Sequence, residues 1–364
     1  MNKTGFGCLR LPLCNADDPK SVDLPYLEKM VDRFLELGGN YFDTAYTYEG
    51  SEAAVRKALV ERHPRISYRL ANKLPGWKAE NYDQCRTLFN EQLERCGVEY
   101  FDVYLLHSMT EANYRIAQRA DQFRFLRELK EKGLAKAIGF SYHDSPELLD
   151  EILTEHPEVD YVQLQINYLD WDNPAIQSEK CYEVAARHNK KVTVMETVKG
   201  GNLSKLPEEA TELLKKCHKD WSVSSWAVRF ATSLENVETV LSGMNTVEQI
   251  EDNLQPFVRL NETEKALLME VARIIRKNTA IGCTACGYCL EGCPRGIPIP
   301  RIFRLYNEYA RFPKDDWHMK QGYIVLAREN APASDCLECG ACEGHCPQKL
   351  PIREWLKAAS KVFD

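Results

Sequence analysis

Two hydrophobic spacings alternate along residues 1–260. Short runs rich in Val, Ile, Tyr and Phe indicate β-strands, and the longer segments between them carry apolar residues at helical spacing. The predicted strands are Gly5–Leu11, Tyr41–Ala45, Tyr68–Leu74, Phe101–His107, Ala135–Ser141, Tyr161–Asn167, Lys191–Val198 and Val237–Gly243. The predicted helices include Pro25–Leu37, Glu52–Val60, Asn81–Cys96, Ala120–Lys132, Pro146–His156 and Ala175–His188. This part of the chain is therefore a β/α repeat.

Strands that alternate with helices run in parallel, because each helix returns the chain to the same end of the sheet. The later strands are nearly continuous in apolar residues, which is typical of strands buried on both faces. We predict the fold class α/β with a closed (β/α)8 TIM barrel, and an open doubly wound sheet is the alternative. Thr263–Lys277 predicts a further helix that leads into the last part of the chain.

Composition excludes several classes of protein. Of the 364 residues, 44% are hydrophobic and 28% charged, which suits a folded chain with a large core. The net charge is −7 and no Lys/Arg stripe is present, so we expect no nucleic-acid partner. No apolar run approaches the length of a membrane span, and the first residues lack the apolar region of a signal peptide. We expect a soluble, cytoplasmic protein without a membrane partner.

The 14 cysteines are unevenly distributed. Six precede residue 279 and eight follow it, a density that marks a cysteine-dependent module. Without a secretory signal, such a module indicates metal ligands in preference to disulfides. We therefore predict two domains, a barrel over residues 1–278 and a small metal-binding domain over residues 279–364.

The eight late cysteines form two copies of one motif, Cys-x2-Cys-x2-Cys-x3-Cys-Pro. In two-cluster ferredoxins the fourth cysteine of each motif ligates the other [4Fe–4S] cluster. We assign one cluster to Cys283, Cys286, Cys289 and Cys346, and the other to Cys336, Cys339, Cys342 and Cys293. Structural zinc is the rival interpretation, but it usually takes two separated Cys-x2-Cys pairs.

The segment between the two motifs is helical in its spacing. Pro300–Arg311 shows this pattern, so the tail resembles an α-helical ferredoxin-like domain of the kind fused to redox enzymes. His345 lies within the second motif, where it could hydrogen-bond to a cluster sulfur or simply face solvent.

Four polar side chains lie at or just beyond the carboxyl ends of the second, third and fourth predicted strands: Asp43, Tyr48, Lys73 and His107. Barrel enzymes place their catalytic groups at this rim. Tyr48 could protonate an oxyanion if a nearby cation lowered its pKa, and Lys73 would supply that charge. Asp43 would hold the ammonium, and His107 would orient a carbonyl oxygen. Each residue alone has an ordinary structural explanation, but four at one rim indicate a catalytic site.

At this point the chain resembles the aldo-keto reductase superfamily over residues 1–260. The matching residues are Gly5-Phe6-Gly7, Phe42-Asp43-Thr44-Ala45, Tyr48-Glu49-Gly50-Ser51-Glu52, Lys73, His107, Gly139-Phe140-Ser141, Gln163, Gly200-Gly201, Gly243 and Asn253. The resemblance implies hydride transfer from NAD(P)H to a carbonyl that Tyr48 protonates. It further implies that Ser141 and Gln163 hold the nicotinamide carboxamide, and that Asp252 and Asn253 contact the adenine.

Several positions depart from the family pattern. Glu196 stands where the family usually stacks a tyrosine under the nicotinamide, and Tyr142 replaces an asparagine. Gly243, Met244 and Gln249 occupy positions that often carry cations for the 2′-phosphate of NADPH, so NADH is slightly favoured. Cys8 faces the cofactor in the family, where it is either a packing residue or a reactive thiol.

Three functions fit these two halves. In the first, the barrel reduces a small-molecule carbonyl, or oxidises the alcohol, with NAD(P)H, and the clusters serve as an electron port or stabilise the fold. In the second, the site around Glu196 and Lys199 holds a flavin, which interconverts hydride and single electrons. An external ferredoxin or other electron carrier then supplies electrons to the clusters, which pass them to the flavin. In the third, the protein is a redox sensor or an electron-transfer subunit. The four rim residues favour the first.

Overall fold

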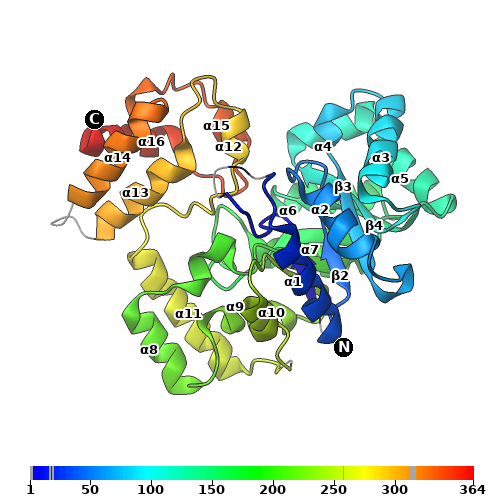
Figure 1. Ribbon diagram of the computed structural model, residues 1–364, viewed down its shortest axis with the longest axis horizontal. Coiled ribbons are helices and arrows are strands. Elements are labelled where there is room, and N and C mark those ends of the chain that lie inside the picture. Colours follow the sequence, from blue (N-terminus) through cyan, green and yellow to red (C-terminus); the bar gives the residue numbers. More distant parts are fainter. Residues whose placement is uncertain (1–2, 16–17, 19, 257, 312–316) are drawn as a thin grey trace. The chain divides into compact units, whose positions relative to one another are not determined.

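A computed structural model describes residues 3–15, 18, 20–256, 258–311 and 317–364. Eight parallel strands form a closed barrel in chain order, from β1 next to β2 round to β8 next to β1. Strands β2, β3 and β4 are labelled in Figure 1. Their bounds are β1 Thr4–Gly7, β2 Tyr41–Asp43, β3 Arg69–Leu74, β4 Phe101–Met109, β5 Ala135–Tyr142, β6 Tyr161–Gln165, β7 Lys191–Met195 and β8 Val237–Ser242. The predicted closed barrel is confirmed, and the open sheet is excluded.

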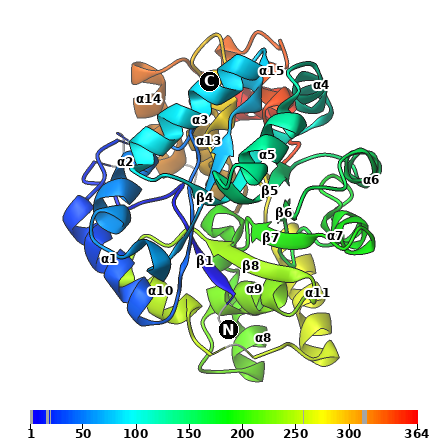
Figure 2. The ribbon, with the colours of Figure 1, turned by 90° about the vertical axis from the view of Figure 1, so that its right-hand side faces the viewer.

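Helices surround the strands (Figure 2). Over the first 260 residues they are α1 Leu24–Glu36, α2 Ser51–Val55, η1 Arg56–Val60, η2 Arg65–Ser67, η3 Gly76–Lys78, α3 Tyr82–Cys96, α4 Glu111–Arg119, α5 Gln122–Glu131, α6 Pro146–Glu155, α7 Ser178–Arg187, η4 Lys199–Ser204, α8 Glu208–Cys217, α9 Val223–Thr232 and α10 Val247–Asn253. The predicted helix Glu52–Val60 is α-helical only as far as Val55 and continues as a π-helical turn.

Each β–α unit folds locally for reasons visible in its sequence. Ser145 caps α6 by accepting the amide N–H of Leu148, and Pro146 occupies the first helical position. The strands are buried along almost their whole length, as parallel strands covered by helices must be. Close contact between β5 and β6 requires glycine, because a Cβ at Gly139 would lie 2.0 Å from the carbonyl oxygen of Tyr161.

Strand β1 is shorter than predicted. It ends at Gly7, and Cys8–Arg10 forms a turn instead of continuing the strand to Leu11. The amide N–H of Cys8 still donates to the Asp43 carbonyl oxygen at 2.8 Å, so the turn is tied to the end of β2. The turn therefore lies at the carboxyl ends of the strands.

The last hundred residues form a helical module. Its helices are α11 Glu262–Lys277, α12 Tyr288–Glu291, α13 Ile299–Arg311, α14 Trp317–Glu329, η5 Ala333–Asp335, α15 Ala341–Gly344 and α16 Ile352–Phe363. Helix α13 packs against α14 and α16 (Figure 1), around a core that includes Phe303, Tyr323 and Leu356. The predicted helix at Pro300–Arg311 is confirmed.

The chain divides into two compact units. The barrel unit comprises Met1–Asn173, Gln177–Val198 and Ser224–Asn261, and the cluster unit comprises Pro174–Ile176, Lys199–Val223 and Glu262–Asp364. The cluster unit thus includes η4 and α8, which follow β7 in the chain. The sequence-based boundary near residue 279 remains a prediction about the domains. Among the described helices, none is both long and apolar enough to cross a membrane.

We predict that Phe34→Ala destabilises the barrel by about 3–5 kcal/mol. Phe34 is fully buried, and its ring lies 5.4 Å from Phe6 and 5.1 Å from Phe42, so its removal leaves a cavity. Urea unfolding of the anaerobic protein, followed by circular dichroism, measures the change. Ile66→Ala is the control, because Ile66 is 97% exposed and its removal costs almost nothing. Equal losses in the two variants would contradict the prediction.

Candidate active site and cysteine cavities

A buried ion pair lies at the centre of the barrel site. Asp43 ends β2 and Lys73 lies in β3, and the Lys73 Nζ donates to the Asp43 Oδ1 at 2.5 Å and to the Thr44 carbonyl oxygen at 2.8 Å. Both side chains are almost fully buried, at 1% and 3% exposure. Burial raises the pKa of Asp43, and the Lys73 charge and hydrogen bond oppose that rise. The pair therefore fixes the ammonium at one position.

Tyr48 lies in the loop between β2 and α2. This loop is held by its own hydrogen bonds: the amide N–H of Tyr48 donates to the Ala45 carbonyl oxygen, and that of Ser51 donates to the Tyr48 carbonyl oxygen, both at 3.0 Å. Gly50 has a φ of 73°, a left-handed conformation that glycine adopts without strain. The phenol oxygen of Tyr48 consequently lies 3.5 Å from the Lys73 Nζ.

His107 completes the group from β4. Its ring centroid lies 5.9 Å from that of Tyr48, and its Nδ1 is 3.4 Å from the Thr47 hydroxyl. Burial lowers the pKa of His107 well below its usual value, and the positive charges of Lys73 and His143 lower it further. The imidazole is therefore neutral at physiological pH, so one ring nitrogen can donate and the other can accept.

The pKa of Tyr48 differs from the expectation. Lys73 was predicted to lower it, but burial raises it well above the usual value of 10, and the charge of Asp43 raises it further. Since Asp43 binds the Lys73 ammonium directly, the two charges largely compensate each other at the phenol. Arg10 lowers the Tyr48 pKa, whereas Glu196 and Cys8 raise it. The phenol thus remains protonated.

Arg10 is a site residue that the sequence did not reveal. The predicted strand Gly5–Leu11 would have continued through it, whereas the turn after Gly7 places its charge near the Tyr48 phenol. No spacing or motif signals this position. Cys8 is buried, and burial together with Asp43 raises the pKa of its thiol, which favours the packing role over the reactive one.

Ser141, near the end of β5, is paired with Gln163 in the middle of β6, so the two residues lie side by side in the sheet. The Ser141 hydroxyl accepts the amide N–H of Ser108 at 2.7 Å. Gln163 is 2% exposed, and its Oε1 has no hydrogen-bond partner within the described part of the chain. A buried amide oxygen without a partner is costly, so this position fits an incoming N–H group such as that of a carboxamide.

The other predicted cofactor residues lie directly after β7, directly after β8 and in α10. Glu196 follows β7 with a φ of 56°, and its carbonyl oxygen accepts from the Asn167 side chain. Gly243 follows β8, and the Asn253 Nδ2 donates to the Ser242 hydroxyl at 2.8 Å. Asp252 and Asn253 also line a cavity of about 320 Å³.

Asp170, in the loop after β6, is fully buried and accepts hydrogen bonds from the side chains of Gln165 and Asn167 at 2.9 Å each. Its carboxylate stabilises the loop after β6.

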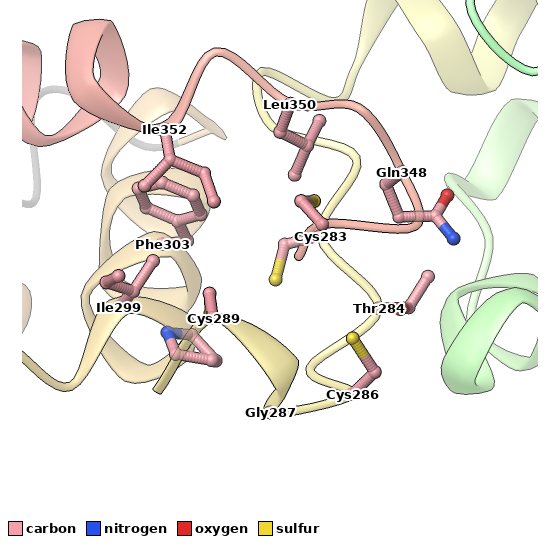
Figure 3. A pocket seen from close by; sticks show the side chains of 12 residues that line it. Cys283, Thr284, Cys286, Gly287, Cys289, Ile299, Phe303, Gln348, Leu350 and Ile352 are labelled. Carbon is pink, nitrogen blue, oxygen red and sulfur yellow. The ribbon is translucent and has the colours of Figure 1, made fainter. Parts of the chain in front are cut away.

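The first cysteine cavity lies within the cluster unit. It has a volume of about 310 Å³ and contains the four predicted ligands of one cluster, namely Cys283, Cys286, Cys289 and Cys346. Figure 3 shows Ile299, Phe303 and Ile352 on one side of it, and Thr284 and Gln348 on the other. Burial raises the pKa of Cys289, and the other three thiols raise it further. The fourth cysteine of the second motif is thus brought to the first motif.

The second cysteine cavity has the same volume, about 310 Å³. It contains the other four predicted ligands, Cys336, Cys339, Cys342 and Cys293. Burial and the charge of Glu343 raise the pKa of Cys342 to about 11, and Cys336 and Cys293 contribute. The exchange of the fourth cysteine between the motifs is therefore reciprocal.

The parallel barrel thus places the buried Asp43–Lys73 pair, Tyr48 and His107 together at the carboxyl ends of its strands, where barrel enzymes hold their catalytic groups. The family model described as "Aldo/keto reductase family" matches residues 5–273, and the one described as "4Fe-4S dicluster domain" matches residues 282–350. The chain belongs to the aldo/keto reductase family and carries a C-terminal 4Fe–4S dicluster domain.

Individual relatives agree with this assignment. An aldo-keto reductase of Mycobacterium avium (strain 104) is 28% identical over 232 residues, which is 63% of this chain and 75% of the relative. The holo form of aldo-keto reductase AKR11C1 from Bacillus halodurans superposes with a TM-score of 0.60 at 24% identity, over 74% of this chain and 91% of that one. An aldo-keto reductase from Klebsiella pneumoniae in complex with NADPH gives 0.59 at 16%, over 74% and 90%. The two solved structures show a shared fold.

We predict that His107 remains neutral at pH values well below 6.5, where an ordinary histidine is protonated. Because its folded pKa lies below the unfolded value of about 6.5, the unfolded chain binds the extra proton first. His107 therefore lowers the free energy of unfolding as the pH falls below 6.5, by at most about 1.4 kcal/mol per pH unit. Imidazole ¹⁵N NMR measures its protonation, and His107→Gln assigns the signal. Protonation with a midpoint at or above pH 6.5 would contradict the prediction.

Proposed function

We propose that the protein catalyses the NAD(P)H-dependent reduction of a small-molecule carbonyl, or the reverse oxidation of the alcohol, with Tyr48 as the proton donor. The observation that carries this proposal is the position of the Tyr48 phenol, 3.5 Å from the buried Lys73 ammonium and edge-on to a neutral His107. A phenol with a raised pKa keeps its proton until a strong base, such as an alkoxide, forms beside it.

The residues around the barrel rim fit a nicotinamide cofactor. Ser141 and the buried Oε1 of Gln163 would hold its carboxamide. Further contacts along the cofactor would come from Glu196, Gly243, Asp252 and Asn253. When bound, a nicotinamide supplies or accepts a hydride, and the protein contributes position and electrostatics.

The proton is handled by the chain's own residues. His107, which is neutral and lies near the end of β4, would donate a hydrogen bond to the carbonyl oxygen and so orient the carbonyl. Tyr48 would transfer its proton to that oxygen as negative charge develops there. Lys73 would stabilise the phenolate that remains, because its ammonium lies 3.5 Å from the phenol oxygen and opposite charges attract at that distance. Asp43 keeps Lys73 in place during this transfer.

The residues expected near the adenosine 2′ position bear on the choice between NADH and NADPH. Gly243 has no side chain, Met244 is buried, and Gln249 is engaged with the amide N–H of Asn245. None of the three offers a cation to a 2′-phosphate, which favours NADH slightly. The related Klebsiella pneumoniae structure contains NADPH, so NADPH is the alternative to test.

We further propose that each cysteine cavity holds one [4Fe–4S] cluster, within a domain that spans residues 279–364. Four thiols that converge on one apolar-lined cavity suit a cubane cluster better than a structural zinc site made of two separated pairs. Bound clusters carry single electrons, and an external ferredoxin or another electron carrier would exchange electrons with them. A flavin in the barrel is the competing hypothesis, and flavin absorbance in the purified protein would favour it.

We predict that Tyr48→Phe lowers kcat for NADH-dependent reduction of small aldehydes and ketones by about 10²-fold or more, because the proton donor is lost. Turnover is measured anaerobically as NADH oxidation across a carbonyl panel. Tyr46→Phe is the matched control, since the Tyr46 hydroxyl is 3.3 Å from Glu91 and 3.4 Å from Arg95, at the edge of the loop. If Tyr48→Phe retained wild-type turnover, Tyr48 would not be the acid.

A second prediction concerns the clusters. Cys346→Ser should remove the same cluster as Cys289→Ser, so each variant loses about half of the reconstituted iron. Iron and sulfide analysis together with EPR measures the loss. Cys14→Ser is the control, because Cys14 is exposed and belongs to neither cavity. Loss of different clusters in the two variants would contradict the exchange of the fourth cysteine.

A further inference from the structure

The segment directly after β7 contacts the first cysteine cavity from within the cluster unit. The Asn202 Nδ2 donates to the Cys283 carbonyl oxygen at 2.9 Å. Gly200 has a φ of 63°, and a Cβ there would lie 2.4 Å from the Thr284 carbonyl oxygen, so only glycine fits. The segment Lys199–Asn202 is therefore fitted closely to the loop that carries Cys283 and Cys286.

Lys199 begins this segment with a buried side chain. It is 5% exposed, and its Nζ donates to the Oε1 of Gln348, which is 6% exposed, at 2.8 Å. Gln348 follows Cys346 by two residues, and its amide points away from the cysteines (Figure 3). The Lys199 Cε is also 3.9 Å from the position of a Cβ on Gly282, the residue before Cys283. The Lys199 side chain thus lies beside two loops that carry ligands of the first cavity, the one with Cys283 and the one with Cys346.

We infer that Lys199 is a positioning residue that raises the reduction potential of the first cluster, the one assigned to Cys283, Cys286, Cys289 and Cys346. This inference rests on the proposed cluster ligands. Reduction adds one electron, and hence one negative charge, to the cluster. A fixed positive charge nearby stabilises the reduced form more than the oxidised form, and burial weakens the screening by water.

The electrostatics around the cysteines support this inference. The Lys199 Nζ is held 2.8 Å from the side-chain amide of Gln348, two residues after Cys346, so its positive charge is fixed beside the loop that carries this ligand. The arginines near the second cavity are placed differently. Arg295 and Arg353 are about half exposed, and they pair with Asp335 at 2.7 Å and Glu343 at 2.9 Å. Water and the carboxylates weaken their effect on the second cluster.

The test is a potentiometric titration of the anaerobically reconstituted full chain, followed by EPR. In Lys199→Met, one of the two midpoint potentials should fall while the other stays unchanged. We expect the ratio of reduced to oxidised first cluster at a fixed potential to fall about ten-fold, which corresponds to about 59 mV. Lys199→Arg should restore the wild-type midpoint, because it keeps the charge. Lys199→Gln, which can still hydrogen-bond to Gln348, provides the same test if the methionine variant loses its cluster.

Two controls make the outcome specific. Lys349→Met removes an exposed lysine close to Cys346 and should shift the midpoint less than Lys199→Met does. Cys289→Ser, which removes a proposed ligand of the first cluster, identifies the midpoint that belongs to that cluster. Unchanged midpoints in Lys199→Met and Lys199→Gln, or an equal shift in Lys349→Met, would overturn the inference and leave the proposed clusters intact. A wild-type protein without two cluster signals would overturn the cluster assignment itself, and the inference with it.

Discussion

The buried ion pair between Lys73 and Asp43 is the interaction on which the barrel site depends. Taking either charge out of water costs several kcal/mol, and this cost is offset only when the partner is in place. Asp43 ends β2 and Lys73 lies in β3, so the pair forms only when these strands align in their observed register. The strand register that joins β2 to β3 in the barrel therefore also places the Lys73 ammonium. Tyr48 and His107 are positioned relative to that fixed charge.

This arrangement bears on the role that we propose for Tyr48 as the proton donor. A cation that simply lowered the pKa of Tyr48 would favour phenolate in the resting enzyme, which is the wrong protonation state for an acid. Because Asp43 compensates the charge of Lys73 and burial dominates, the proton stays on the phenol. In the proposed reaction the ammonium would act at the moment of proton transfer, when a phenolate would form 3.5 Å from it. It would then stabilise the charged product of the transfer more than the resting state, as catalysis of the proposed reaction requires.

Sequence patterns predicted the parts of the structure that depend on local spacing. All eight strands were predicted, because parallel strands buried on both faces are continuous apolar runs. The grouping of the eight cysteines in space also agrees with the motif spacing. Long-range electrostatics were not predictable: the turn that brings Arg10 to Tyr48, and the raised pKa of Tyr48, depend on packing between distant segments. The grouping of Lys199–Val223 with the cluster unit has no local signal either.

The two cysteine motifs have the same backbone conformation but different surroundings. Their backbones repeat closely: Ala285 and Glu338 both have a φ of 53°, Gly287 and Gly340 are both left-handed, and Gly296 corresponds to Lys349, with φ of 65° and 48°. Two sites with the same ligands and the same backbone would have similar chemistry. Differences between them must therefore come from side chains outside the motifs. The loop of the first motif contacts the segment after β7, whereas Glu343 of the second motif pairs with the exposed Arg353. The two motifs therefore have different electrostatic surroundings.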